Sequence, residues 1–291
     1  MTFPGSSGNY FFKDFYFLYE NNDFKKFFQY NLIMQRNFSC EATILLIHQS
    51  GENNRTVTFF SKEDGIFYAT LFGGPKSKLR SLVSPFNSGT LFYYKNETKN
   101  ISKITDFDVK SCHLSFRESL FKTYAATLAS EIILKTKCAG SSKKAFSLFN
   151  ALLDGMDFFD DAESEKGLLR FLWRYIELSG VKPEVRFCCQ CGTDFLSNRF
   201  TAENISYKAL YSPLQKSLIC QNCLSPNQNG LFLSVESITY LEAITNLPPK
   251  TVRSINISQN AIKELKDFCY TLIEIICNQK LLTFQTGNGI L

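Results

Sequence analysis

Two C-x-x-C pairs constrain this chain more than any other feature of its sequence. Cys188 and Cys191 form the first pair, Cys220 and Cys223 form the second, and the segment between them has the pattern of a β-hairpin. Such an arrangement brings four thiolates to the corners of a tetrahedron, which is the geometry of structural zinc sites. We therefore predict a closed zinc knuckle within residues 186–225, with Zn²⁺ in a purely structural role.

The spacing and the neighbouring cysteines keep other interpretations open. The 28 residues between the pairs exceed the roughly 15–20 of the common zinc ribbon. Cys189 competes as a ligand, but with Cys191 it would form a C-x-C bite that rarely serves a tetrahedral site. Disulfides and a degenerate, empty site are also compatible with the pattern. The remaining cysteines stand singly in apolar or helical surroundings, as reduced core residues do, which indicates an intracellular protein: Cys40, Cys112, Cys138, Cys189, Cys269 and Cys277.

The sequence lacks the marks of a catalytic site. Four thiolates leave zinc no open coordination position, and a zinc deaminase needs an H-x-E run that the chain does not have. The only histidines are His48 and His113, which we expect to be ordinary strand-end or loop residues. There is no G-x-x-x-x-G-K-[ST] loop and no credible Ser-His-Asp or Cys-His set. We expect a protein that is not an enzyme.

Length and charge narrow the class of partner. A chain of 291 residues that is 44% hydrophobic can bury a sizeable core and divide into two or three units. Its formal charge of +5 and its pI near 8.6 favour a polyanionic partner. Between Leu71 and Phe86 there are three cations, Lys76, Lys78 and Arg80, and no acid.

Residues 1–33 form an extension of unusual composition, with twelve aromatic residues and a formal charge of zero. No apolar run is long enough to span a membrane, and no basic segment followed by an apolar one marks a signal peptide. Met34 stands directly before the first ordered pattern. The extension is therefore either the product of a start assigned too far upstream or an addition that packs on the first domain.

Residues 34–112 have the pattern of a small β domain. Short runs of β-forming residues are separated by turn signals, among them Lys62-Glu63-Asp64-Gly65, whose glycine suits positive φ. The predicted strands are 41–49, 55–61, a third that ends at Phe72, 91–94 and 101–109. Five short strands favour a closed or partly open barrel such as an OB-fold, with an SH3-like barrel as the alternative.

From residue 113 to residue 291 the hydrophobic period is helical. Apolar residues recur at spacings of three and four from Leu120 to Ile132, again over 146–159 and 167–178, and once more after the cysteines. Ser234 and Ser258 are plausible N-caps of the later helices. The predicted fold class is therefore α+β: an N-terminal OB-fold barrel, then a helical domain that carries the inserted zinc knuckle.

This order of barrel, helices, four-cysteine knuckle and helices resembles the bacterial RecO recombination mediators. The resemblance runs from Met34 to the C-terminus and rests on the order and spacing of several stretches. They are Gly51-Glu52-Asn53-Asn54-Arg55, residues 61–65, the basic loop 73–80, Leu82-Val83-Ser84-Pro85-Phe86, residues 168–174 before Gly180 and Pro183, residues 188–192, and Tyr211-Ser212-Pro213. The chain departs from the family at Lys216 and Ser217, where relatives often have glycines, and its basic loop has fewer arginines.

The resemblance implies a non-catalytic protein of DNA repair and homologous recombination, in the RecF pathway. Such a protein binds single- and double-stranded DNA, anneals complementary strands, and works with RecR to load RecA onto DNA coated by single-stranded-DNA-binding protein. It implies a monomer that acts in the cytoplasm at the nucleoid and away from membranes. The alternative from another class is an RNA-binding OB and zinc-ribbon protein of translation or transcription.

Candidate DNA contacts follow from general electrostatics and stacking. Cations that neutralise phosphates give affinity that is independent of sequence and falls with salt, and we expect this role for Arg36, Arg55, Lys76, Lys78 and Arg80, with the first two as neighbours across the barrel. Aromatic residues on a barrel face stack bases, but strands alternate faces, so half of the set Phe67, Tyr68, Phe92 and Tyr93 should be core.

The helical unit resembles the part of the family that docks the acidic, apolar C-terminal tail of single-stranded-DNA-binding protein. Such a tail requires a cation beside an apolar groove. Sequence alone does not choose the docking residues among the available cations, which are Lys122, Lys135, Lys137, Arg170 and Arg174.

Overall fold

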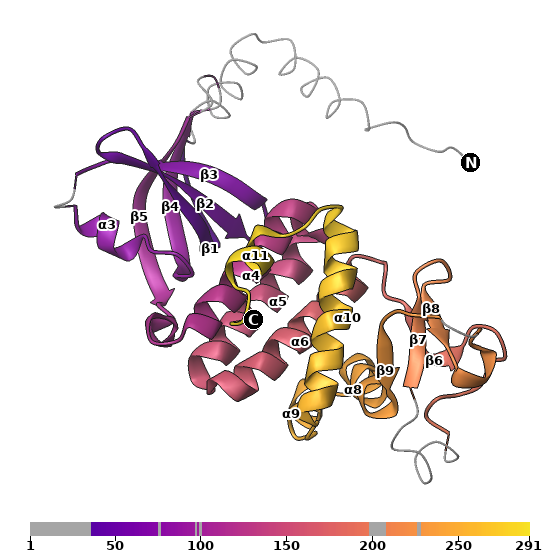
Figure 1. Ribbon diagram of the computed structural model, residues 1–291. Helices are drawn as coiled ribbons and strands as arrows, with labels where there is room; N and C mark the ends of the chain where they lie inside the picture. The colour runs from indigo at the N-terminus through magenta and orange to yellow at the C-terminus, as the bar shows by residue number, and fades with distance from the viewer. Residues whose placement is uncertain (1–35, 75–76, 97, 99–100, 198–207, 226–227) are drawn as a thin grey trace, which may run out of the picture.

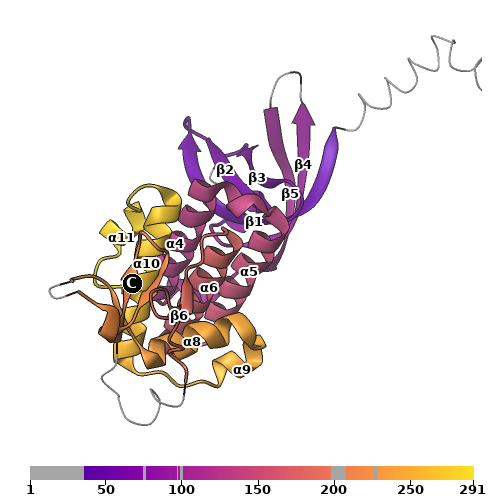
Figure 2. The same cartoon turned by 90° about the vertical axis from the view of Figure 1, so that its right-hand side faces the viewer.

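A computed structural model of the chain describes residues 36–74, 77–96, 98, 101–197, 208–225 and 228–291. Residues 1–33, with both explanations offered for them, lie outside this part, as does Lys76. A β-barrel lies at one end of the molecule and a smaller four-stranded sheet at the other, with helices between them (Figures 1 and 2). No helix of the described ranges has the length and apolar character needed to cross a membrane.

The barrel is closed, with strand order β1-β2-β3-β5-β4. Its long first strand pairs with β4 through its first half and with β2 through its second half, and a bulge between Ile44 and Leu46 marks the change. This five-stranded, closed arrangement is that of an OB-fold, as predicted. The strands are β1 (Asn37–Ser50), β2 (Asn54–Ser61), β3 (Gly65–Leu71), β4 (Ser88–Asn96) and β5 (Ile101–Ser111), and the short helix α3 (Lys78–Leu82) lies between β3 and β4.

Alternation along the strands divides the barrel into a core and an outer face. Residues such as Val57, Phe59, Ala69 and Leu91 fill the interior. Phe60, of opposite parity, points outward and contacts the rings of Phe146 and Phe149 on the neighbouring helix. One part of the outer face is therefore buried against the helical unit.

The helical unit follows the barrel directly. Ser234 and Ser258 each accept a hydrogen bond from the backbone N–H three residues later, so both predicted N-caps are confirmed. Asp160 caps α6 in the same way, through the N–H of Glu163. The helical elements are η1 (Leu114–Arg117), α4 (Leu120–Thr136), η2 (Lys137–Gly140), α5 (Ser142–Phe158), α6 (Asp161–Leu178), α8 (Val235–Asn246), α9 (Pro249–Arg253), α10 (Gln259–Cys277) and α11 (Leu282–Thr286).

The cysteine segment is inserted between α6 and α8. Its sheet has the order β6-β8-β7-β9, with β7 and β8 forming an antiparallel hairpin whose turn residue Lys216 has φ 48°. Buried residues such as Val185, Tyr211 and Leu218 belong to the same hydrophobic core as the helices. The segment is thus part of the helical unit rather than a separate body. Its elements are β6 (Glu184–Cys188), β7 (Lys208–Ser212), β8 (Ser217–Ile219), η3 (Gln221–Cys223) and β9 (Phe232–Ser234).

The barrel and the helices are joined by specific contacts. The hydroxyl of Thr43 on β1 donates to Oδ1 of Asn150 on α5 over 2.7 Å, and Thr43 is fully buried. His113, between β5 and η1, is also buried and contacts α5 through Asp154. His113 therefore joins the two units, whereas His48 lies exposed on β1.

Candidate metal centre and nucleic-acid surface

The four predicted cysteine ligands come together at one end of the β6-β8 pair. Cys188 ends β6, Cys191 lies in the turn after it, Cys220 follows β8 and Cys223 ends η3. Each C-x-x-C pair closes a tight turn, because the N–H of Gly192 donates to the carbonyl of Cys188 and the N–H of Cys223 donates to that of Cys220. Gly192 has φ 69°, a conformation that favours glycine.

The spacing of the sulfurs suits a tetrahedral metal. All four Sγ atoms lie within 4.8 Å of one another, and those of Cys191 and Cys220 are 3.6 Å apart. Neighbouring sulfurs around a tetrahedral Zn²⁺ are separated by about 3.8 Å, given Zn–S bonds of about 2.3 Å. None of the ten cysteines forms a disulfide. The cluster can hold a metal ion.

The hydrogen-bond partners of Cys191, in the cluster, differ from those of Cys189, outside it. The hydroxyl of Thr193 lies 3.1 Å from Sγ of Cys191, and this hydroxyl, together with the backbone N–H of Thr193, lowers the pKa of the Cys191 thiol to about 6. Cys189 instead donates to the side-chain carbonyl of Gln215. Cys188, and not Cys189, is the member of the cluster, as the spacing argument favoured.

The predicted DNA-contact residues lie around the barrel and not at a single point. Arg36 precedes β1 beside the end of β4, where its guanidinium donates to the hydroxyl of Tyr94, whereas Arg55 is opposite Gln49 near the other end of β1. The two are therefore at opposite ends of the strand. Arg55 has no ion pair within the described ranges, although acids at 52 and 63 are near in sequence.

Lys78 and Arg80 lie on α3, which is on the side of the barrel away from the helices (Figure 1). Lys78 is exposed, and Arg80 is half-buried with its guanidinium 3.5 Å from the carbonyl of Gly73. Lys103 of β5 adds a cation there that sequence patterns did not indicate. Its ammonium lies 5.4 Å from the ring centre of Phe72, which is itself 44% exposed. We call Lys78, Arg80, Lys103 and Phe72 the basic rim.

The alternation expected of the barrel aromatics is confirmed. Tyr93 is buried and Phe67 half-buried in the barrel core, whereas Tyr68 and Phe92 are exposed. Of the four candidates, only Tyr68 and Phe92 are available to stack on a ligand. Tyr68 lies on β3, on the outer face of the barrel.

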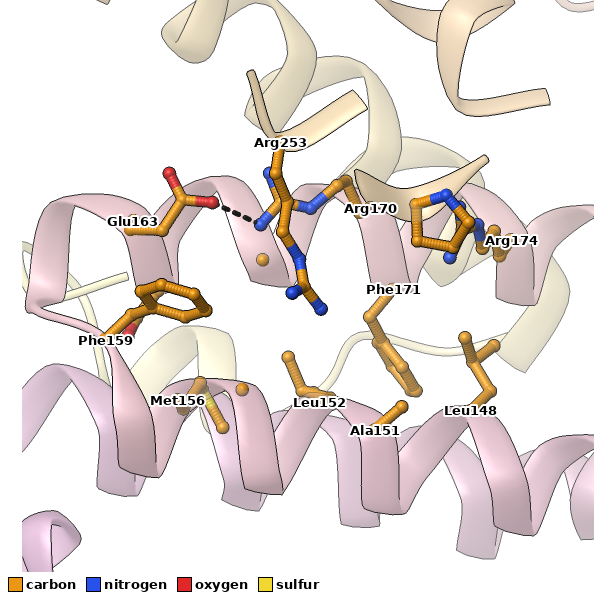
Figure 3. A pocket seen from close by; sticks show the side chains of 14 residues that line it. Leu148, Ala151, Leu152, Met156, Phe159, Glu163, Arg170, Phe171, Arg174 and Arg253 are labelled. Carbon is orange, nitrogen blue, oxygen red and sulfur yellow. Dashed lines mark hydrogen bonds and ion pairs between the residues drawn. The ribbon is translucent and has the colours of Figure 1, made fainter. Parts of the chain in front are cut away.

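A groove between α5 and α6 gathers arginines over an apolar floor (Figure 3). Its volume is about 210 Å³. Arg170 is bound to Glu163 over 2.6 Å and to the hydroxyl of Tyr240 over 3.1 Å, while Arg253 of α9 lies over the ring of Phe159. The groove is lined by Leu148, Ala151, Leu152, Gly155, Met156, Phe159, Glu163, Ser164, Gly167, Arg170, Phe171, Arg174, Pro249 and Arg253.

The other cations considered for a partner tail lie elsewhere. Lys122 is buried, with its ammonium 3.4 Å from the hydroxyl of Ser115. Lys135 and Lys137 are exposed at the end of α4, in a cleft beside the barrel. Arg253, which no sequence pattern singled out, completes the groove. It comes from a short helix far along the chain, and no local motif marks it.

The fold and the cysteine cluster define a class of protein: an OB-fold barrel followed by a helical domain into which a four-cysteine hairpin is inserted. The family model described as "Recombination protein O N terminal" matches residues 34–113, and the model described as "Recombination protein O C terminal" matches residues 117–276. The chain belongs to the RecO family.

Curated relatives named "DNA repair protein RecO" are similar along most of their length. The protein of Desulforamulus reducens is 21% identical over 250 residues, which is 85% of this chain and 93% of the relative. That of Shouchella clausii is 25% identical over 195 residues, or 65% and 70% of the two chains, and that of Bacillus pumilus is 26% identical over 200 residues, or 67% and 71%. Membership supports a role in DNA repair and recombination, with DNA as the implied ligand.

Proposed function

We propose that this protein is a non-catalytic recombination mediator. It binds single- and double-stranded DNA, anneals complementary strands, and acts as a monomer with RecR to load RecA onto DNA coated by single-stranded-DNA-binding protein at the nucleoid. The observation that carries this proposal is the α5–α6 groove, because its charge and shape suit the acidic, apolar tail of that coating protein.

The groove has more positive charge than its own acids neutralise. Glu163 is occupied by Lys166 over 2.8 Å and by Arg170 over 2.6 Å, and these bonds, acting against burial, hold its pKa below the usual range. Burial, the charge of Arg170 and then that of Arg253 lower the pKa of Arg174. A carboxylate placed beside Arg174 and Arg253 would offset the repulsion between these like-charged arginines.

The floor of the groove supplies the second half of the recognition. Leu148, Ala151 and Phe159 keep part of their apolar surface exposed beside the arginines (Figure 3), which suits the apolar end of the tail. The hydroxyl of Ser164 lines the same groove, is buried, and has no hydrogen-bond partner among the described residues.

DNA binding is assigned to the barrel. The cations of the basic rim lie on the exposed side of an OB-type barrel, where phosphate contacts release counterions and give affinity without sequence preference. Lys76 belongs to the same loop in sequence. Phe72, under the ammonium of Lys103, adds an aromatic face for an unpaired base.

The cysteine cluster is assigned to structural zinc. Four thiolates fill the coordination shell, so the metal supplies folding free energy and leaves no position for a substrate. Since Cys188 and Cys220 belong to the helical core, zinc would stabilise the unit that contains the groove. No reaction is assigned to this protein.

The experiment is annealing of two complementary fluorescent oligonucleotides, bare and coated with the cognate single-stranded-DNA-binding protein. We expect the protein to accelerate annealing in both states, and we expect the change Lys76→Ala/Lys78→Ala/Arg80→Ala and added salt to reduce the acceleration. Folded, zinc-loaded protein that accelerates neither reaction would remove the mediator role. A preference for RNA over DNA of the same sequence would favour the RNA-binding alternative.

A further inference from the structure

A second cleft lies between the barrel and the helical unit, away from the α5–α6 groove. Its volume is about 640 Å³. One wall is the outer face of β1, β2 and β3, and the other is the end of α4 with η2. We propose that this cleft receives a single unpaired nucleotide of DNA, with its base on Tyr68 and its phosphate at Lys135 and Lys137. The proposal rests on the DNA-binding function above.

The barrel wall is a continuous row of outward-facing side chains. Leu46 is paired with Thr58, and Thr58 is paired with Tyr68, so the three lie side by side across three strands. His48 and Thr56, two residues further along β1 and β2, are the next cross-strand pair on the same face. The outer face of strands 2 and 3 is the surface with which OB-folds bind oligonucleotides. The helical unit covers part of it, through Phe60; in the row itself Thr58 is buried, whereas Leu46 and Tyr68 are exposed.

Tyr68 has the position required of a stacking residue. Its side chain is 61% exposed although it lies in the middle of β3, and none of the described rings stacks on it. Leu46, also exposed at 39%, extends the apolar surface beside it. A base that is already unpaired presents a free face to this ring, whereas a base in a duplex must first be unstacked.

The opposite wall supplies positive charge. Lys135 and Lys137 are both exposed, and among the described residues Lys135 bonds to the neutral side chain of Gln279 alone, at 3.2 Å. Asp64 is the one acid among the described residues lining the cleft, against these two lysines. The cleft therefore favours an anion, and a phosphate 5′ or 3′ to the stacked base meets that requirement.

The backbone beneath Lys137 is unusual. Lys137, Cys138 and Ala139 have φ values of 48°, 64° and 48°, so three successive non-glycine residues are left-handed. At this end the two walls touch, because a Cβ on Gly65 would come within 2.8 Å of the hydroxyl oxygen of Ser142. The cleft is thus closed at Gly65 and opens toward Tyr68. Strained backbone that the surrounding packing enforces is concentrated at ligand sites.

The test is photocrosslinking of the full-length protein to a single-stranded oligonucleotide carrying 5-iodocytosine, with the crosslinked residue identified by mass spectrometry. We expect the crosslink at Tyr68. We expect Tyr68→Leu, at an exposed position, to lower single-strand affinity about fivefold or more, as for the loss of one stacked base. Duplex affinity should be unchanged.

The lysines are tested with a matched control. Lys135→Ala/Lys137→Ala should reduce the crosslink yield and should lower the salt slope of single-strand binding by about 1.4, for two phosphates. Lys143→Ala/Lys144→Ala, two exposed lysines of the neighbouring α5, should change neither. Strong single-strand binding with crosslinks elsewhere, and an unaltered affinity of Tyr68→Leu, would overturn the cleft alone. Failure to bind any DNA would overturn the proposed function with it.

Discussion

The imidazole Nε2 of His113 lies 2.9 Å from Oδ1 of Asp154, and this pair connects the residue after the barrel to α5. On its other side the ring Nδ1 lies 2.9 Å from the carbonyl oxygen of Phe86. Each ring nitrogen of His113 therefore has one oxygen within hydrogen-bond distance, one from the stretch before β4 and one from α5. Since the His113 side chain is only 1% exposed, the contact replaces water at the junction of the two units.

Replacing this histidine should loosen the junction. We expect His113→Ala to lower the free energy of unfolding by about 1–3 kcal/mol, because it removes a fully buried ring together with its hydrogen bonds to Phe86 and Asp154. Denaturant titration followed by fluorescence measures the loss. Cys112→Ser, at the exposed neighbouring position, is the control and should unfold like the unaltered protein. An unchanged midpoint for His113→Ala would mean that the junction depends on apolar packing alone.

The cysteine cluster makes a prediction about metal content. We expect Cys191→Ser and Cys220→Ser to lose zinc and to be less stable or less soluble, since metal binding supplies folding free energy. Cys189→Ser should keep its metal, because Cys189 bonds to Gln215 outside the cluster. Metal analysis and thermal melts with and without a chelator provide the measurements. A soluble, folded Cys220→Ser protein with stoichiometric zinc would refute the assignment.

Charge reversal in the α5–α6 groove should weaken the proposed binding of the tail. We expect Arg174→Glu to weaken binding of a fluorescent acidic peptide, with the sequence of the coating protein's C-terminus, by more than about tenfold, because a like charge then faces the peptide carboxylates. Fluorescence anisotropy gives the affinity. Lys143→Glu is the control on the exposed surface of α5 and should bind normally. Equal affinities for the two variants would place the tail elsewhere.

Ser130 of α4 offers a stabilising substitution. It is 4% exposed, and its hydroxyl has no hydrogen-bond partner within the described ranges. Ser130→Ala removes that desolvated hydroxyl and improves helix propensity, so we expect a gain of about 1 kcal/mol in the free energy of unfolding. Ser147→Ala, on the exposed surface of α5, should change little. A destabilised Ser130→Ala protein would show that the hydroxyl does have a partner.

Local patterns predicted the barrel well, because each strand has its own alternation. The first strand, predicted over 41–49, is longer in the structure, at Asn37–Ser50, since its first half pairs with β4 and its second half with β2. That double pairing depends on closure of the barrel, which no local pattern contains. The caps Ser234 and Ser258 were predictable for the opposite reason, as each acts within a single turn.

The metal cluster was predictable from a local motif, whereas the groove was not. Cys188 and Cys191 are close in sequence, and the C-x-x-C spacing places both sulfurs on one turn. The sequence therefore predicted that the cysteine sulfurs would cluster. Arg253 reaches the groove only because α9 packs near α5 and α6, about 80 residues from Arg174. Contacts made through tertiary packing have no periodic signature. Lys135 and Lys137, which sequence offered for the tail, belong instead to the cleft at the barrel.

The groove between α5 and α6 shares no residue with the basic rim, so a ligand bound to one uses none of the contacts of the other. A coating protein held by its flexible tail would keep its DNA tethered within reach of the barrel. The second binding event then becomes intramolecular, at an effective concentration set by the tether and not by the bulk solution. Weak phosphate contacts would suffice under such avidity, and a strand could be exchanged between proteins without ever being released into solvent.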